Sequence, residues 1–136
     1  MTTSSPIDTF LRGQRFAVVG ASVNREKYGN KTLRAYQQQQ LEVFPINPRA
    51  DEVEGLVAYA GLEDLPVTVD GISIITPPAV TEKVVDQAIE LGIRNIWMQP
   101  GAESPAAIER AEAAGINVIA GGPCLLVVLQ FREDHD

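Results

Sequence analysis

The chain has 136 residues, of which 45% are hydrophobic, and it carries a formal net charge of −7. This length and composition predict one globular domain, residues 1–136, with enough apolar material to form a buried core. The acidic balance argues against a general nucleic-acid-binding or anionic-membrane role. No apolar run approaches the roughly 20 residues that span a bilayer.

The N-terminus and the number of cysteines indicate the cellular compartment of the protein. The opening MTTSSPIDTF has neither the basic stretch nor the apolar stretch of a secretion signal, and residues 1–12 are expected to form a short helix or an arm. Cys124 is the only cysteine, so no disulfide can form within the chain. These features favour a reducing cytoplasm.

Short apolar runs that end in glycine or proline predict buried strands. They lie at residues 15–19, 42–46, 70–75, 95–98 and 116–119. Each run is too short for an independent helix and is bounded by residues that break regular structure. A weaker run at 55–59 predicts one further strand, at an edge of the sheet.

Helical patterns fill the gaps between these runs. Leu33 and Tyr36 mark one face of a helix over about residues 30–40. A second helix is predicted to begin at or just after Thr76-Pro77 and to end at Gly92, and a third to run from the Ser104-Pro105 cap to Gly115. This alternation predicts an α/β fold of three layers, with a parallel sheet in strand order 3-2-1-4-5-6 between helices.

Ligands of such open sheets bind beyond the carboxyl ends of the strands, where the strand order reverses. The predicted reversal lies between the strand that ends at Gly20 and the strand that ends at Ile75. The segments Gly20-Ala21-Ser22 and Thr76-Pro77-Pro78 should therefore face each other across one crevice.

The small residues after the first strand suit a phosphate. Gly20 permits a tight turn, Ala21 and Ser22 carry little bulk, and the next helix should point its N-terminus at the same place. Residues 20–50 carry a charge of +3, so the remainder of the chain carries −10. The alternatives are a plain strand-to-helix turn and a solvated basic helix face.

Two features narrow the choice of nucleotide. The dinucleotide fingerprint G-x-G-x-x-G is absent, and the second strand ends in Ile46-Asn47-Pro48-Arg49, without the carboxylate that binds the ribose of NAD. An arginine at this place suits a further phosphate on the ribose. NADP and coenzyme A, with its 3′-phosphate, remain as candidates.

A series of motifs points to a family. They are VVGAS, NREKYGNK at 24–31, PINPRADEVEG at 45–55, ITPP at 75–78, IWMQPG at 96–101 and GGPC at 121–124. In their order and spacing the chain resembles, from about Phe16 to Leu126, the small stand-alone CoA-binding proteins. These proteins are relatives of the CoA-binding domain of the succinyl-CoA synthetase α-subunit.

The resemblance implies a Rossmann-like fold that binds CoA or an acyl-CoA. By this resemblance the phosphates lie at Gly20, Ala21 and Ser22, with Lys27, Tyr28 and Gly29 along the same loop. The adenosine and its 3′-phosphate are bordered by Asn47, Pro48 and Arg49. Thr76, Pro77 and Pro78 line the crevice wall, and Gln99 lies near the start of the pantetheine arm. The family often has lysine in place of Arg49, and Glu-His where this chain continues LLVVLQF after Cys124.

No catalytic residue or metal site is predicted. The only histidine, His135, lies in a polar terminus, so no Ser-His-Asp or Cys-His pair is visible. Cys124 is either a reactive thiol near the bound ligand or an inert, partly buried side chain, and Trp97 is expected in the core.

These observations favour a non-catalytic carrier, sensor or subunit. An NADP- or NAD-binding Rossmann protein is the alternative, and an interaction subunit with a vestigial ligand site is the third reading. A protein partner or a homo-oligomer stays open.

Overall fold

The computed structural model describes residues 5–122 and 124–133. Its helices are α1 (Pro6–Leu11), α2 (Tyr28–Gln38), α3 (Pro78–Leu91), α4 (Pro105–Ala113) and α5 (Leu125–Val128), with a 3-10 turn, η1 (Leu62–Asp64). Its strands are β1 (Arg15–Val19), β2 (Glu42–Ile46), β3 (Glu52–Val53), β4 (Leu56–Val57), β5 (Gly71–Ile74), β6 (Asn95–Met98) and β7 (Asn117–Ile119). Residues 1–4 of the predicted arm, Pro123 of the GGPC turn and His135 lie outside the described residues.

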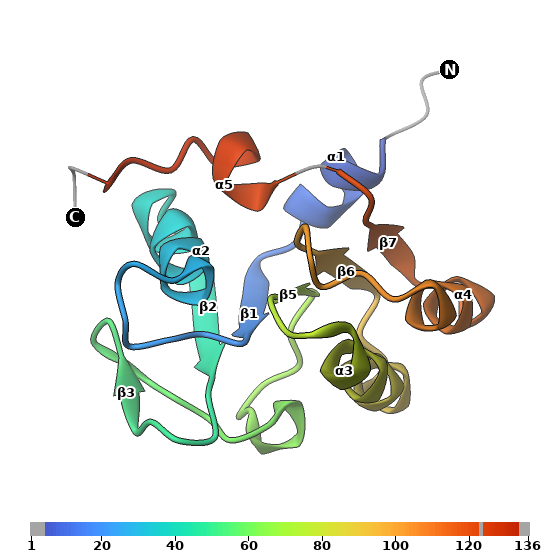
Figure 1. Ribbon diagram of the computed structural model, residues 1–136, viewed down its shortest axis with the longest axis horizontal. Helices are drawn as coiled ribbons and strands as arrows, with labels where there is room; N and C mark the ends of the chain where they lie inside the picture. Colours follow the sequence, from blue (N-terminus) through green and yellow to red (C-terminus); the bar gives the residue numbers. More distant parts are fainter. Residues whose placement is uncertain (1–4, 123, 134–136) are drawn as a thin grey trace.

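Five strands form one parallel sheet in the order β2-β1-β5-β6-β7. Helices cover both faces of this sheet, as Figure 1 shows, so the predicted α/β fold with a parallel sheet is confirmed. Because β1 lies between β2 and β5, the strand order reverses beside β1. The reversal lies where the sequence predicts it.

The edge strand predicted at residues 55–59 forms only in part, as the two-residue strand β4 and a bridge at Tyr59. Glu54 and Gly55 have φ values of +50° and +81°, so the chain turns there. Residues on either side pair as the antiparallel hairpin β3–β4. Only Tyr59 reaches the main sheet, through a single parallel bridge to Ile46. The order 3-2-1-4-5-6 therefore holds without its first strand.

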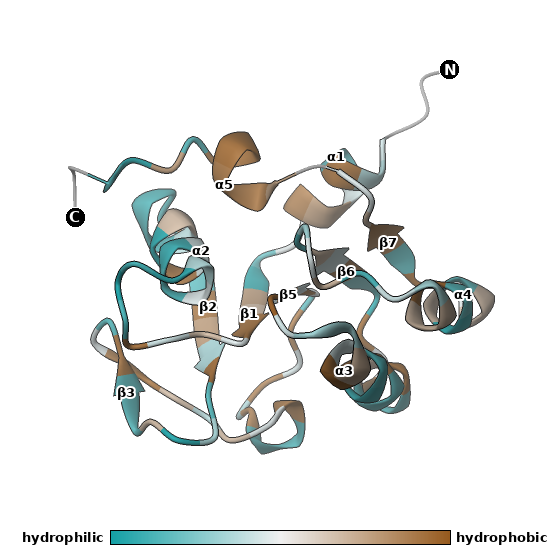
Figure 2. Ribbon diagram, in the orientation of Figure 1, coloured by the Kyte–Doolittle hydropathy of each residue, from teal (hydrophilic) through white to brown (hydrophobic). Residues whose placement is uncertain are grey.

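Alternating side chains of the strands build two separate cores. In β1, Phe16 and Val18 pack in one core with residues of α1, α2 and α5, and Ala17 and Val19 pack in the other with residues of α3, α4 and η1. Figure 2 shows α5 as an apolar segment and β1 as hydrophilic at its start and apolar at its end. This period of two places each strand between two helical layers.

Aromatic side chains fill the core on the α1, α2 and α5 face. Phe16 stacks on Phe10 and Tyr36, with ring centroids 5.3 and 5.0 Å apart, and Trp97 meets Phe10 edge to face. Trp97 is fully buried, as expected. The Tyr36 hydroxyl lies 2.6 Å from Ser73 Oγ. Burial raises the pKa of Tyr36 above its ordinary value, so the phenol stays protonated inside this core.

Candidate functional site

Gly20 forms the turn at the carboxyl end of β1. Its φ is +98°, and a Cβ built at this position would lie 2.6 Å from the carbonyl oxygen of Ile75. Its amide donates to the carbonyl oxygen of Ile46 at 3.3 Å. Gly20 is therefore packed between the ends of β2 and β5, and glycine meets both the conformational and the steric requirement.

Gly29 brings α2 against this turn. A Cβ at Gly29 would collide with the carbonyl oxygen of Gly20. Gly29 thus provides the close approach of helix to strand that the last glycine of the dinucleotide fingerprint provides. The N-cap residue Lys27 makes no side-chain capping bond. The amides of Asn30 and Lys31 donate to the carbonyl oxygen of Lys27 at 3.1 Å, so the amides of Tyr28 and Gly29 and the partial positive charge of the helix remain for a ligand at this edge.

A buried polar network holds the loop between Gly20 and α2. Asn30 donates to the carbonyl oxygen of Ser22 at 2.8 Å and to Glu54 at 3.0 Å. Arg34 donates to Asn30 Oδ1 at 2.6 Å and to the carbonyl oxygen of Arg25 at 2.7 Å. The loop is therefore fixed from α2 and from the β3–β4 turn before any ligand arrives.

Asn47 ties the end of β2 to the end of β1. Its Nδ2 donates to the carbonyl oxygen of Ala21 at 2.9 Å, and its Oδ1 accepts from the backbone amide of Arg49 at 2.8 Å. Asn47 thus orders both the small-residue turn and the segment that carries Arg49.

Three cavities adjoin along this edge of the sheet. The first, of about 460 Å³, lies between the ends of β1 and β2, η1 and the first half of α3. The second, of about 420 Å³, shares Gly20 with the first and borders the start of α2. The third, of about 260 Å³, shares Tyr28 and Ile75 with the second and reaches Cys124. Together they form a groove, which we call the carboxyl-edge groove.

Most of the predicted site residues line this groove. They are Gly20, Ala21, Ser22, Lys27, Tyr28, Gly29, Asn47, Pro48, Arg49, Thr76 and Gln99. Pro77 and Pro78 line none of the three cavities; they are the N-cap and the first residue of α3, and both are exposed. Their contact with a ligand stays a prediction.

Gln99 closes the far end of the groove. Its side chain is buried, accepts from the amide of Leu125 at 2.9 Å and donates to Cys124 Sγ at 3.6 Å. Gln99 thereby joins the end of β6 to the start of α5. Cys124 is half-buried and lines the 260 Å³ cavity beside Tyr28.

Sequence reasoning missed the side of the groove that α3 and η1 provide. Val80, Lys83 and Gln87 of α3 line the 460 Å³ cavity, as do Leu62 and Glu63 of η1. The sequence predicted a helix between Thr76-Pro77 and Gly92. It carried no signal that a flanking lysine would border the same cavity as the end of β2.

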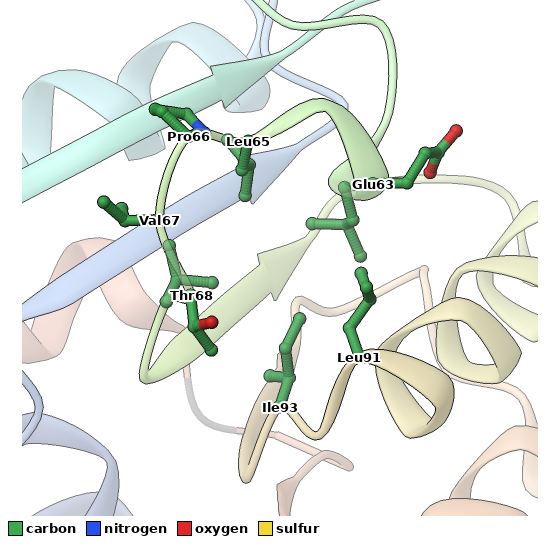
Figure 3. A pocket seen from close by; sticks show the side chains of 9 residues that line it. Glu63, Leu65, Pro66, Val67, Thr68, Leu91 and Ile93 are labelled. Carbon is green, nitrogen blue, oxygen red and sulfur yellow. The ribbon is translucent and has the colours of Figure 1, made fainter.

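A separate cavity of about 220 Å³ lies between η1, the segment that precedes β5 and the end of α3. Leu65, Leu91 and Ile93 point toward its centre, and the carboxylate of Glu63 points away from it (Figure 3). Leu91 and Ile93 flank the end of α3 and precede the amino end of β6. This cavity is therefore not part of the edge at which such sheets bind nucleotides.

Neither a metal-binding cluster nor a helix that could span a membrane is present among residues 5–122 and 124–133. No three His, Cys, Asp or Glu side chains are grouped so that they could hold a metal ion. In the same part of the chain, no helix combines the length and the apolar character needed to cross a bilayer.

Comparison of sequences relates the chain to CoA ligases. It is 31% identical over 93 residues to the α-subunit of an ADP-forming acetate–CoA ligase from Pyrococcus furiosus, which covers 66% of this chain and 20% of that subunit. The chain thus spans about a fifth of that relative's length. It is 26% identical over 108 residues to YneT of Bacillus subtilis, with 79% and 80% of the two chains covered.

Solved structures agree with this relation. A conserved hypothetical protein from Pyrococcus furiosus is 41% identical, with a TM-score of 0.79 and coverage of 85% of this chain and 98% of that one. A dinucleotide-forming acetyl-coenzyme A synthetase from Ca. Korarchaeum cryptofilum is 31% identical, with a TM-score of 0.68 and coverage of 77% and 25%. The family model described as "CoA binding domain" matches residues 14–130. The chain therefore belongs to the family of CoA binding domains.

Proposed function

We propose that the chain binds coenzyme A or an acyl-CoA in the carboxyl-edge groove and acts as a non-catalytic carrier, sensor or subunit. The observation that carries this proposal is the groove itself: three adjoining cavities that run from Arg49, past the start of α2, to Cys124. CoA is an elongated ligand with a phosphorylated adenosine, a pyrophosphate and a pantetheine arm. The groove offers a matching environment for each part.

The adenosine end suits the 460 Å³ cavity. Buried apolar side chains of Val19, Ile46, Leu62 and Val84 provide a surface for a base, and Arg49 lies in the same lining. The pyrophosphate suits the 420 Å³ cavity, because Gly20, Ser22 and the start of α2 border it. The pantetheine arm then extends toward Gln99, and the thiol toward Cys124.

One form of this proposal is that the chain is the CoA-binding part of a larger ligase. The Pyrococcus furiosus relative is named as a ligase subunit, and this chain matches a fifth of it. The CoA-holding step would then belong to this chain and the acyl-activating chemistry to another. A cytoplasmic location and a single-domain organisation stay predictions.

NADP is the second candidate ligand. Arg49 favours it, because an arginine at the end of the second strand accommodates the 2′-phosphate of NADP as well as it does a 3′-phosphate. If NADP binds, its nicotinamide half would occupy the 260 Å³ cavity at Gln99 and Cys124. CoA would place its thiol there.

Thermal unfolding in the presence of CoA, acetyl-CoA, NAD, NADP and ATP tests the proposal. A ligand present at about 100 times its dissociation constant adds about 2.7 kcal/mol to the free energy of unfolding. We expect CoA or its acyl form to raise the unfolding temperature most. A larger shift with NADP would favour the second candidate, and no shift with any of the five would contradict both.

A further inference from the structure

Lys83 is the lysine of α3 that borders the 460 Å³ cavity. It lies three residues after Val80 and four before Gln87, and all three residues line the same cavity. Because positions three and four apart share a helix face, this face of α3 is turned toward the end of β2. Lys83 and Arg49 thus reach one cavity from two different elements.

Arg49 and Lys83 form no ion pair within the described part of the chain. The lining contains Arg49 and Lys83 as its only cations and Glu63 as its only carboxylate. Within the described residues, no hydrogen bond engages the guanidinium of Arg49 or the ammonium of Lys83. Two unpaired cations in one cavity of a chain with a net charge of −7 are an arrangement that favours an anion.

Two cations in one cavity favour an anion that carries about two negative charges. A phosphomonoester carries about −1.5 to −2 charges at pH 7, whereas each phosphate of a pyrophosphate diester carries one. We infer that Lys83 is a specificity-determining residue of the proposed site and that, with Arg49, it binds a phosphomonoester on the ribose of the nucleotide. Arg49 would supply the planar fork and Lys83 a compact point charge. This inference rests on the proposed function.

The test compares CoA with 3′-dephospho-CoA by calorimetry, in the wild type and in Lys83→Met. The loss of Lys83 should weaken CoA binding at least about tenfold and leave dephospho-CoA within about twofold, because only CoA carries the group that Lys83 contacts. Lys83→Arg should keep the preference for CoA. Arg94→Met is the control: it also removes one positive charge, and Arg94 is exposed, precedes β6 and lines none of the three cavities.

The pH dependence of CoA binding distinguishes a contact of Lys83 with the ligand from a purely structural role of Lys83. The phosphomonoester has its second pKa at about 6, so it loses a charge as the pH falls from about 7.5 to about 5.5. The preference for CoA over dephospho-CoA should therefore fall over this range in the wild type. In Lys83→Met the fall should be smaller.

The outcomes separate this inference from the proposed function. If the wild type binds CoA, and Lys83→Met keeps the wild-type ratio of the two affinities, the inference is wrong and the proposed function stands. The same holds if the wild type binds both ligands equally. If the wild type binds neither ligand, both the proposed function and the inference are wrong.

Discussion

Gly29 is a residue whose role depends on one contact. It lies in the first turn of α2, where alanine would ordinarily favour the helix by about 1 kcal/mol. A Cβ at this position would collide with the carbonyl oxygen of Gly20. The backbone of either the turn or the helix would therefore have to move, and both border the groove.

We expect Gly29→Ala to lower the free energy of unfolding by about 2 kcal/mol, the usual cost of overpacking. Gly92→Ala is the control, because Gly92 has a φ of +73° but nothing within 4 Å of a built Cβ. Gly92→Ala should lower the free energy of unfolding by about 1 kcal/mol, through backbone strain alone. Urea unfolding measures both, and a Gly29→Ala variant as stable as the wild type would contradict the packing argument.

Arg49 and Ser22 are expected to act on different phosphates. Arg49→Ala should weaken CoA about ten- to a hundredfold, the loss of one charge-assisted hydrogen bond, and should weaken dephospho-CoA much less. Ser22→Ala keeps the backbone donors, so it should weaken both ligands alike and near the lower end of that range. Calorimetric titration of both variants checks this. An unchanged ratio in Arg49→Ala would show that Arg49 does not bind the 3′-phosphate.

At the scale of elements, breaker-bounded apolar runs were sufficient to predict the sheet. The runs at 15–19, 42–46 and 95–98 match β1, β2 and β6 in both bounds. They could be predicted because a buried parallel strand is apolar throughout and ends at a turn. The run at 55–59 joins the main sheet only at Tyr59, because the turn at Glu54 and Gly55 pairs Leu56 and Val57 with β3 in a hairpin.

Helix α5 could not be predicted from its own residues. Its four residues, LLVV, are too few to show a helical period, and they resemble a buried strand. The helix forms where Gln99 accepts the amide of Leu125 and where Leu125 is fully buried. Tertiary contacts therefore determine this element, as they determine that Lys83 and Glu63 border the groove.

Two substitutions within α5 test this account. Leu125→Ala should lower the free energy of unfolding by about 2–5 kcal/mol, because it leaves a cavity in the core. Val127→Ala is the control in the same helix. Because Val127 is 76% exposed, this substitution should change the free energy of unfolding by less than about 0.5 kcal/mol. Thermal or urea unfolding compares the two, and equal effects would contradict the burial of α5 against the sheet.

At the scale of the whole molecule, the topology assembles the groove. Gly20, Asn47, Thr76 and Gln99 follow four different strands, and parallel pairing brings all four to one edge. Their position at that edge could be predicted from the sequence. The division of the edge into three adjoining cavities could not, since it depends on η1, α3 and α5, which close its sides.

The most direct test of the proposed groove is the map of backbone amide chemical shifts while CoA is added to the isotopically labelled protein. We predict that the largest changes occur at Gly20, Tyr28 and Gln99, one for each part of the groove, and that Val67 and Ile93 beside the 220 Å³ cavity change little. Saturating changes centred on Val67 and Ile93, or no change with CoA at any amide, would contradict the account.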